Sequence, residues 1–168
     1  VKESYLRWHA HLGDWEQAAW KAWMNLGYAA TGSSPELASR MQYFRQNHDE
    51  TVMNRDRLLP RAIQLVTEMA ISYAPPKPPK SELAPVELAE KMAGFMQDGV
   101  DCGDFMPHDK TVAMQIATIM VQSPDEDSHI DEDGLFARER AAFIRLAKTP
   151  ETHARINAML DDGAPVRN

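Results

Sequence analysis

Apolar residues recur every three or four positions along most of the chain, which is the spacing of one face of an α-helix. The clearest stripe is Trp15, Ala18, Ala19, Ala22, Trp23 and Leu26. Asp14 precedes this stripe and Gln17 follows three residues later, as in a capping box. The pattern predicts a helix that begins after Asp14 and ends at Gly27. A shorter helix over residues 5–12 is expected before it, with Gly13 as its end.

Two pairs of residues combine a cap with a proline and mark further helix starts. Ser34 precedes Pro35, and Thr149 precedes Pro150. Proline is well tolerated at the first helical position, because an N–H there would have no partner within the helix. The first pair predicts a short helix that ends near Phe44. The second predicts a last helix that ends at residues 161–163 and faces inward through Ile156, Met159 and Leu160.

A longer apolar stripe follows Asn54, which is the expected start of another helix. Its members are Leu59, Ala62, Ile63, Val66, Met69, Ala70 and Tyr73. Pro60 lies six positions after Asn54, and proline inside a helix removes a hydrogen bond and kinks the turn. The first turn of this helix is therefore the part that the pattern leaves undecided.

The second half of the chain predicts three more helices before the last one. The first carries Val86, Ala89, Met92, Ala93 and Met96, and Gly99 should end it. The second begins at Pro107 and runs to about residue 120. The third runs from a cap at Asp131 to about Lys148. No segment shows a convincing strand pattern, so the sequence predicts an all-α fold of about seven helices.

The clearest break in the sequence is a run of prolines. Residues 74–80 read Ala-Pro-Pro-Lys-Pro-Pro-Lys, and four prolines in five positions favour polyproline II and exclude a helix. The expected organisation is an N-terminal helical lobe over residues 1–74, a spacer over 75–80 and a C-terminal helical lobe over 81–168.

Charge and composition narrow the function classes. The chain has 168 residues and a net charge of -7, which disfavours nucleic acid and anionic membrane surfaces as partners. No apolar run reaches the length of a membrane helix. Cys102 is the only cysteine, so a disulfide framework is excluded and a cytoplasmic location is expected. The chain begins with Val1 rather than Met, which we interpret as a sign of a longer polypeptide.

No motif in the chain predicts a self-contained active site. Aligning Gly134 with the glycine of an EF-hand loop puts His129 at the first position and Arg140 at the twelfth, where calcium needs acidic ligands. The six histidines are scattered, and the pairs Glu151 with His153 and His9 with His11 are two positions apart rather than the three or four typical of a helical metal site. Nucleophile elbows and phosphate-binding glycine loops are missing. We therefore expect no catalytic, cofactor-binding or metal-binding residue in this chain.

Four tryptophans lie within sixteen residues: Trp8, Trp15, Trp20 and Trp23. Trp15 and Trp23 belong to the apolar stripe, so packing in the core is the simplest interpretation. Trp20 lies off that stripe, which favours a second contact surface. The cluster is therefore a candidate interface with a subunit or a neighbouring domain.

The second half of the chain resembles a known enzyme family. The similar segments are residues 108–113 (His-Asp-Lys-Thr-Val-Ala), 137–143 (Ala-Arg-Glu-Arg-Ala-Ala-Phe), 149–160 and 163–168, with residues 52–59 upstream. In this order they resemble the C-terminal region of bacterial multifunctional 3-hydroxyacyl-CoA dehydrogenases that carry a crotonase-type enoyl-CoA hydratase domain. Ala164, Val166 and the Ser123-Pro124 pair depart from the family pattern.

The resemblance implies where the chemistry of such an enzyme would lie. Its dehydrogenase needs a glycine-rich Rossmann loop for NAD and a catalytic histidine. Its crotonase part stabilises a thioester enolate of acyl-CoA with backbone N–H groups and uses carboxylates for proton transfer. These elements precede the region that this chain resembles, so no catalytic residue carries over to it. Residues 1–73 would correspond to the closing helices of the crotonase part.

Two functions are therefore expected from the sequence. The first is a C-terminal helical region of a fatty-acid β-oxidation enzyme with a structural or assembly role. Its partners would be the N-terminal dehydrogenase and crotonase domains, or a second copy in a homo-oligomer. The second is a free-standing helical module that binds a protein through its tryptophan-rich surface.

Overall fold

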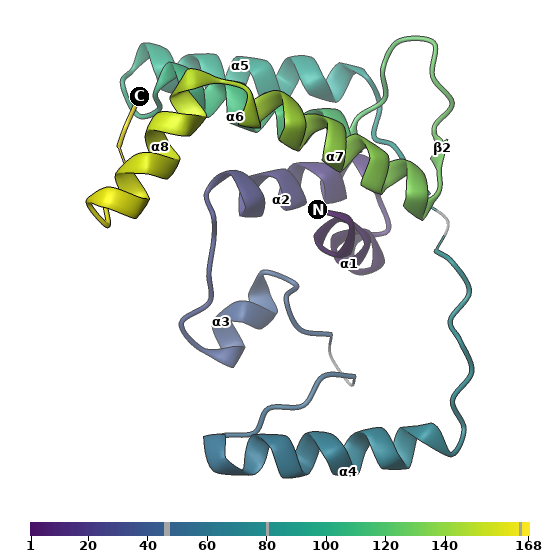
Figure 1. Ribbon diagram of the computed structural model, residues 1–168. Helices are drawn as coiled ribbons and strands as arrows, with labels where there is room; N and C mark the ends of the chain where they lie inside the picture. The colour runs from purple at the N-terminus through teal and green to yellow at the C-terminus, as the bar shows by residue number, and fades with distance from the viewer. Residues whose placement is uncertain (46–47, 80, 165) are drawn as a thin grey trace. The chain divides into compact units, whose positions relative to one another are not determined.

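The fold is all-α, as the hydrophobic pattern predicts. The computed structural model describes residues 1–45, 48–79, 81–164 and 166–168. In these residues the chain forms eight α-helices, one 3-10 helix and a pair of very short strands (Figure 1). The residues group into two compact units, one made of Val1–Thr31 with Pro79–Asn168 and one of Gly32–Pro78. This grouping differs from the expected lobes 1–74 and 81–168, because the first two helices pack with helices that follow the proline run.

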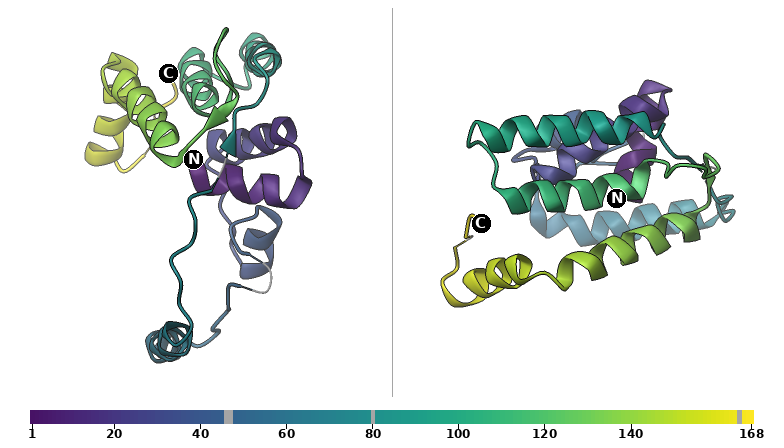
Figure 2. Two further views of the ribbon diagram at one scale, coloured as in Figure 1. Left: turned by 90° about the vertical axis from the view of Figure 1, so that its right-hand side faces the viewer. Right: turned by 90° about the horizontal axis from the view of Figure 1, so that it is seen from above.

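The larger unit contains six helices. They are α1 (Lys2–Leu12), α2 (Trp15–Gly27), α5 (Glu87–Asp101), α6 (Pro107–Met120), α7 (Glu132–Ala147) and α8 (Pro150–Asp161). The first two form a helical hairpin, and α2 packs on α6, which also contacts α5 and α7 (Figure 2). Because α6 packs against α2, α5 and α7 and buries Ala113, Ala117, Ile119 and Met120, it is the centre of this unit.

Side-chain caps set the helix starts that the sequence predicts. In each case a side-chain oxygen accepts a hydrogen bond from a backbone N–H in the first turn: Asp14 from Gln17 at 2.7 Å, Ser34 from Leu37 at 3.2 Å, Asp131 from Gly134 at 2.7 Å and Thr149 from Thr152 at 3.3 Å. Such a bond satisfies one of the N–H groups that have no partner within the helix. Gly13 ends α1 with φ at 72°, a conformation that favours glycine.

Two hydrogen-bonded aromatic side chains lie in the core of the larger unit. Tyr5 is fully buried, and its hydroxyl donates to the carbonyl of Glu82 over 2.6 Å. Burial raises the pKa of the Tyr5 hydroxyl above its usual range, so it remains a neutral donor. Trp23 is 2 % exposed, and its indole N–H donates to the carbonyl of Ala113 over 2.7 Å. Both bonds connect the N-terminal hairpin to residues beyond the proline run.

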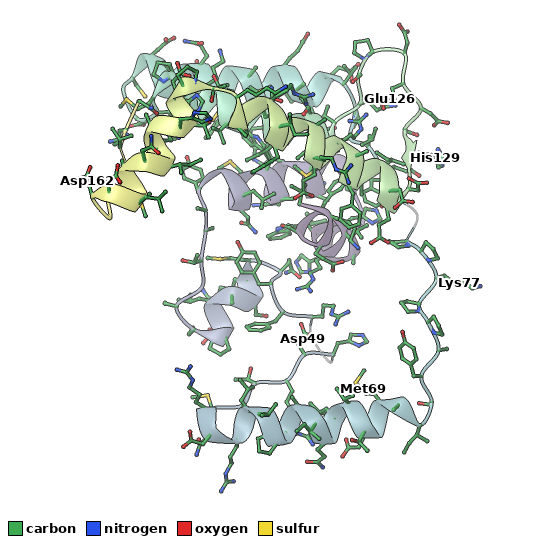
Figure 3. The ribbon with its side chains drawn as sticks, in the orientation of Figure 1. Asp49, Met69, Lys77, Glu126, His129 and Asp162 are labelled. Carbon is green, nitrogen blue, oxygen red and sulfur yellow. The ribbon has the colours of Figure 1, made fainter. Side chains whose placement is uncertain are left out.

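No segment of the sequence indicates a strand, and the structure corrects this expectation at one place. Strand β1 (Ser81–Glu82) pairs antiparallel with β2 (His129–Ile130), which lies in the acidic segment over residues 125–133. Figure 3 labels Glu126 and His129 in this segment. Each strand has only two residues, which is too short to show an alternating pattern.

Gly99 does not end a helix as predicted, because α5 continues through it to Asp101. Gly99 is buried, and a Cβ atom at this position would lie 2.1 Å from Cδ2 of Phe105. The glycine therefore makes room for the Phe105 ring after the chain turns back at Gly103, whose φ is 85°.

The smaller unit contains α3 (Pro35–Arg40), the 3-10 helix η1 (Arg55–Arg57) and α4 (Leu58–Ala70). The first ends at Arg40 rather than near Phe44, and Gln42 follows with φ at 59°. Asn54 caps η1 instead of a long helix, accepting from the N–H of Asp56 over 2.9 Å. Because α4 begins only at Leu58, Pro60 lies in its first turn, where proline removes no hydrogen bond.

Two apolar stripes are exposed. The prediction that α8 faces inward through Ile156, Met159 and Leu160 is wrong, because these side chains are 49 %, 52 % and 78 % exposed. The stripe of α4 is exposed too, at Leu58, Leu59, Ile63, Val66 and Met69. Periodicity finds an apolar face but does not say whether anything covers it.

The two helical glycines of α5 give a matched test of how the Phe105 ring packs on this helix. Gly99→Ala should lower the free energy of unfolding by about 1–3 kcal/mol, because its methyl group overlaps the Phe105 ring. Gly94→Ala should raise it by roughly 0.5–1 kcal/mol, since nothing lies within 4 Å of a Cβ there and alanine favours helix. Urea unfolding measures both changes. Equal effects of the two substitutions would contradict the close approach at Gly99.

Candidate functional site

The larger unit contains a cavity of about 340 Å³. It lies where the end of α2, the end of α5, the start of α6 and the C-terminal segment come together. Its lining is mostly apolar: Trp23, Met24, Gly27, Tyr28, Phe95, Met96, Phe105, Val112 and Ala113. Asp104, Asp109, Arg155 and Arg167 complete the wall. A largely apolar pocket with a few polar groups on one side is the usual form of a small-molecule site.

Aromatic rings make up much of the apolar wall. Phe95 packs edge-on against Trp23, with ring centroids 5.9 Å apart and planes at 74°. Phe105 lies 5.9 Å from Phe95 and 5.9 Å from Tyr28. These tilted and edge-on contacts are favourable for aromatic pairs. The hydrogen bond of Trp23 to Ala113 and the fit of Phe105 over Gly99 hold two of the rings in place.

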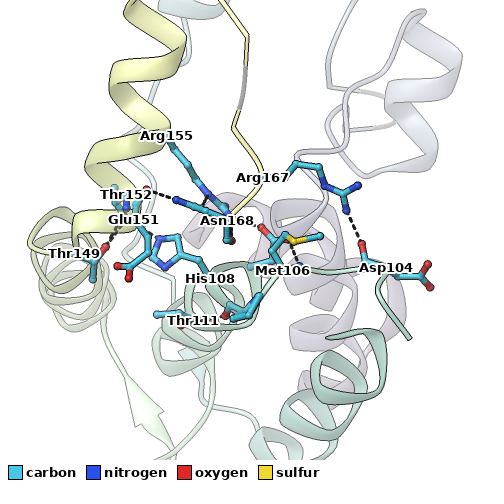
Figure 4. A network of polar contacts seen from close by, with 12 residues as sticks. Asp104, Met106, His108, Thr111, Thr149, Glu151, Thr152, Arg155, Arg167 and Asn168 are labelled. Atoms are coloured by element: carbon cyan, nitrogen blue, oxygen red, sulfur yellow. Dashed lines mark hydrogen bonds and ion pairs between the residues drawn. The ribbon is translucent and has the colours of Figure 1, made fainter. Parts of the chain in front are cut away.

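Arg155 organises the polar side of the cavity (Figure 4). One of its terminal nitrogens donates to Oδ1 of Asp109 over 2.7 Å and to the carbonyl of Asn168 over 3.0 Å. Its Nε donates to Oδ1 of Asn168 over 2.7 Å. Asn168 in turn donates to the carbonyl of Glu151 over 3.1 Å. Arg155 therefore ties α8 both to the start of α6 and to the last residues of the chain.

Asp109 has a second bond besides the one to Arg155. Its Oδ2 accepts from the backbone N–H of Met106 over 2.8 Å, as expected for an acid in the first turn of a helix. Partial burial alone would raise the pKa of this carboxyl. The N–H of Met106 and the guanidinium of Arg155 outweigh burial, so the pKa of Asp109 lies below its usual range. The carboxylate is therefore ionised at neutral pH.

His108 is a buried polar residue beside this network. It is 5 % exposed, and its Nε2 lies 2.9 Å from the hydroxyl of Thr152. Thr152 also accepts a bond from the hydroxyl of Thr149 over 2.7 Å. His108 therefore connects the start of α6 to the start of α8, next to the bond between Asp109 and Arg155.

The structure divides the four tryptophans of the candidate interface into two groups. Trp15 stacks on His9 with ring centroids 3.5 Å apart, and Trp8, in the same hairpin, is buried. Trp20 lies 5.4 Å from Trp23 and 5.8 Å from Phe95, so it packs against two rings of the aromatic wall without lining the cavity itself. Trp15 and Trp20 are only partly buried. These contacts support packing within the chain for all four, and their role as an interface stays a prediction.

The residues of the cavity were not recognised in the sequence as a site. Phe95, Phe105 and Arg155 have no motif of their own. The turn between α5 and α6 brings the two rings together, and the contact of α8 with the start of α6 adds Arg155. Asp109 gave the one usable signal, since an acid three residues after a helix boundary is a typical cap. In the residues that the structure describes, no three His, Cys, Asp or Glu side chains are placed to hold a metal ion. Cys102 is an exposed free thiol.

Comparison with known proteins gives one similarity over nearly the whole chain. The chain is 28 % identical over 171 residues to a probable 3-hydroxyacyl-CoA dehydrogenase of Bacillus subtilis (strain 168). The alignment covers 99 % of this chain but only 21 % of that protein, so the chain spans about a fifth of its relative. None of the protein-family models matches the chain. No solved structure matches it either.

This similarity agrees with the dehydrogenase part of the resemblance seen in the sequence. The name of the relative mentions no hydratase, so the crotonase part stays a prediction. Within the described ranges, none of the helices combines the length and the apolar character that crossing a bilayer requires.

Replacing Arg155 tests the polar network. Arg155→Gln should lower the free energy of unfolding by about 1–2 kcal/mol at pH 7, because it removes a charged hydrogen bond to Asp109. Arg140→Gln is the control, since Arg140 is exposed and its loss should change stability by less than about 0.5 kcal/mol. Denaturant unfolding measures both.

The free energy of unfolding that is lost in Arg155→Gln should depend on pH. The pKa of Asp109 is lowered in the folded protein, so its contribution is complete above the unfolded value of about 3.9 and disappears as pH falls through the folded value. The stability difference between the native chain and Arg155→Gln should therefore shrink below about pH 4. A difference that stays constant from pH 7 to pH 3 would contradict the pairing.

Proposed function

We propose that this chain is a helical part of a 3-hydroxyacyl-CoA dehydrogenase, with a role in folding or assembly rather than in the chemistry. The observation that carries the proposal is the similarity to the Bacillus subtilis protein, which covers nearly all of this chain and about a fifth of the relative. The NAD and acyl-CoA sites would then lie in the remaining, larger part of the polypeptide. A cytoplasmic location fits the single cysteine.

The exposed face of α4 supports an assembly role. Leu59, Ile63 and Val66 are 69 %, 59 % and 66 % exposed and lie on one side of the helix, opposite Gln64 and Glu68. Met69, labelled in Figure 3, continues the same side. Exposed apolar patches of this kind mark surfaces that bind another protein surface. Since most of the relative lies outside the matched region, the rest of the same polypeptide is the partner we propose.

The proposed partners are the N-terminal dehydrogenase domain and a crotonase-type hydratase domain. The crotonase domain is supported by the resemblance of residues 52–59 and of the later segments, not by the name of the relative. The four tryptophans would contribute to this contact through the partly exposed Trp15 and Trp20. A homo-oligomer through the same surfaces is the alternative arrangement.

Two assays test whether the isolated chain lacks dehydrogenase and hydratase activity. The isolated 168-residue chain should neither reduce NAD with 3-hydroxybutyryl-CoA nor hydrate crotonyl-CoA. The product of the complete reading frame that contains this chain should do at least the first. Turnover by the isolated chain would overturn the proposal. A complete product that begins at Val1 would favour the free-standing interaction module.

Substitutions on α4 test the assembly role in the complete product. Ile63→Glu with Val66→Glu should reduce soluble, correctly assembled enzyme, because it buries two charges against the proposed partner. Gln64→Glu with Arg61→Gln makes the same change in net charge on the opposite side and should leave assembly unchanged. Size-exclusion chromatography and NADH formation measure the outcome. Equal behaviour of the two double variants would show that the apolar face of α4 has no partner in the enzyme.

A further inference from the structure

The cavity beside α6 has features that a structural role does not require. Its apolar wall is built from rings held by specific contacts, yet the space that they enclose is left open. Its volume of about 340 Å³ lies at the lower end of the range for ligand pockets, which is roughly 300–1,000 Å³. Met24 and Met96 add flexible, polarisable side chains that can adapt to an apolar ligand.

The charged side chains that line the cavity differ in how many of their hydrogen-bonding atoms already have a partner. Both oxygens of Asp109 are bonded, one to Arg155 and one to the N–H of Met106. Arg155 is occupied by Asp109 and Asn168. Asp109 and Arg155, two of the four charged groups, therefore bond to each other and to neighbouring atoms, which leaves few of their donors and acceptors for a ligand.

Asp104 and Arg167 lie outside this network. A carboxylate oxygen of Asp104 accepts from Sγ of Cys102 over 3.4 Å. Over the part of the chain that the structure describes, the hydrogen bond of Arg167 is the one from Nη2 to the carbonyl of Asp104, 2.9 Å long (Figure 4). The charge of Arg167 helps to lower the pKa of Asp109. A guanidinium carries five N–H donors and matches a carboxylate with two parallel bonds. Arg167 therefore leaves N–H donors available at the edge of an apolar cavity.

We propose that this cavity binds a small amphipathic anion. The apolar body of the ligand lies against Trp23, Phe95 and Phe105, and its anionic head group accepts hydrogen bonds from Arg167. An aliphatic carboxylate of medium length has this chemistry. The site goes beyond the assembly role proposed above and does not depend on it, because all of its residues belong to the larger unit of this chain.

Binding can be followed at the indole of Trp23 in the full 168-residue chain. Its N–H is hydrogen-bonded to Ala113, so it should give a distinct NMR signal that moves when the cavity is filled. Sodium decanoate, kept below its micelle concentration, is the probe, and decylamine is the control for the head group. Decanoate should shift the Trp23 signal in a saturable way, while the indole signals of Trp8 and Trp15, which do not line the cavity, should move little.

Two variants locate the binding. Gly27 lines the cavity, and a Cβ at this helical position meets no atom within 4 Å, so Gly27→Leu should fill the space without strain. It should weaken decanoate binding at least tenfold. Gly94→Leu is the matched control, because Gly94 is also helical and unobstructed but lies outside the cavity. It should leave the Kd unchanged.

Arg167→Gln tests the head group and should raise the Kd for decanoate roughly tenfold, as expected for the loss of a charged hydrogen bond. Arg140→Gln is its control. The proposal is overturned if decanoate does not shift the Trp23 signal, if Gly27→Leu and Gly94→Leu bind equally, or if decylamine binds as tightly as decanoate. If Gly27→Leu does not fold, the Arg167→Gln and decylamine comparisons still decide the question.

Discussion

The larger unit depends on the contact between α2 and α6, and above all on the buried indole of Trp23. An indole N–H taken out of water must find an acceptor, and the carbonyl of Ala113 supplies it inside the core. The contact fixes α2 against the central helix. It also positions the ring that forms one wall of the cavity, so the fold of this unit and its candidate binding site rest on the same hydrogen bond.

The same contact explains why the chain does not divide at its prolines. Residues 32–78 leave the larger unit after α2 and return to it before β1. The conformational entropy lost on closing such a loop grows only slowly with the length of the loop. The apolar area and the hydrogen bond buried between α2 and α6 stabilise the unit whatever that length is. A long interruption between two packed segments is therefore tolerated, and sequence proximity is a poor guide to which helices share a core.

Local signals in the sequence were reliable where local chemistry decides the structure. Asp14 caps its helix as expected, because a cap needs only a side chain and an N–H three residues away. Gly99 does not end its helix, since its role is set by the ring of Phe105 and not by the backbone. The exposure of Ile156 and the position of Arg155 in the cavity wall depend on tertiary packing. The periodicity of apolar residues carries no information about that packing.

The proline run has a consequence for how the chain behaves when it is cut. Residues 73–79 are exposed or nearly so and form no regular structure. The Tyr73–Ala74 bond at their start has no proline on either side, which makes it a natural place for a protease to nick. The N-terminal piece would still carry α1 and α2, whose packing on α6 does not need the severed bond. The two pieces should therefore separate on a denaturing gel yet travel together in native buffer, as complementing fragments of a single folded unit.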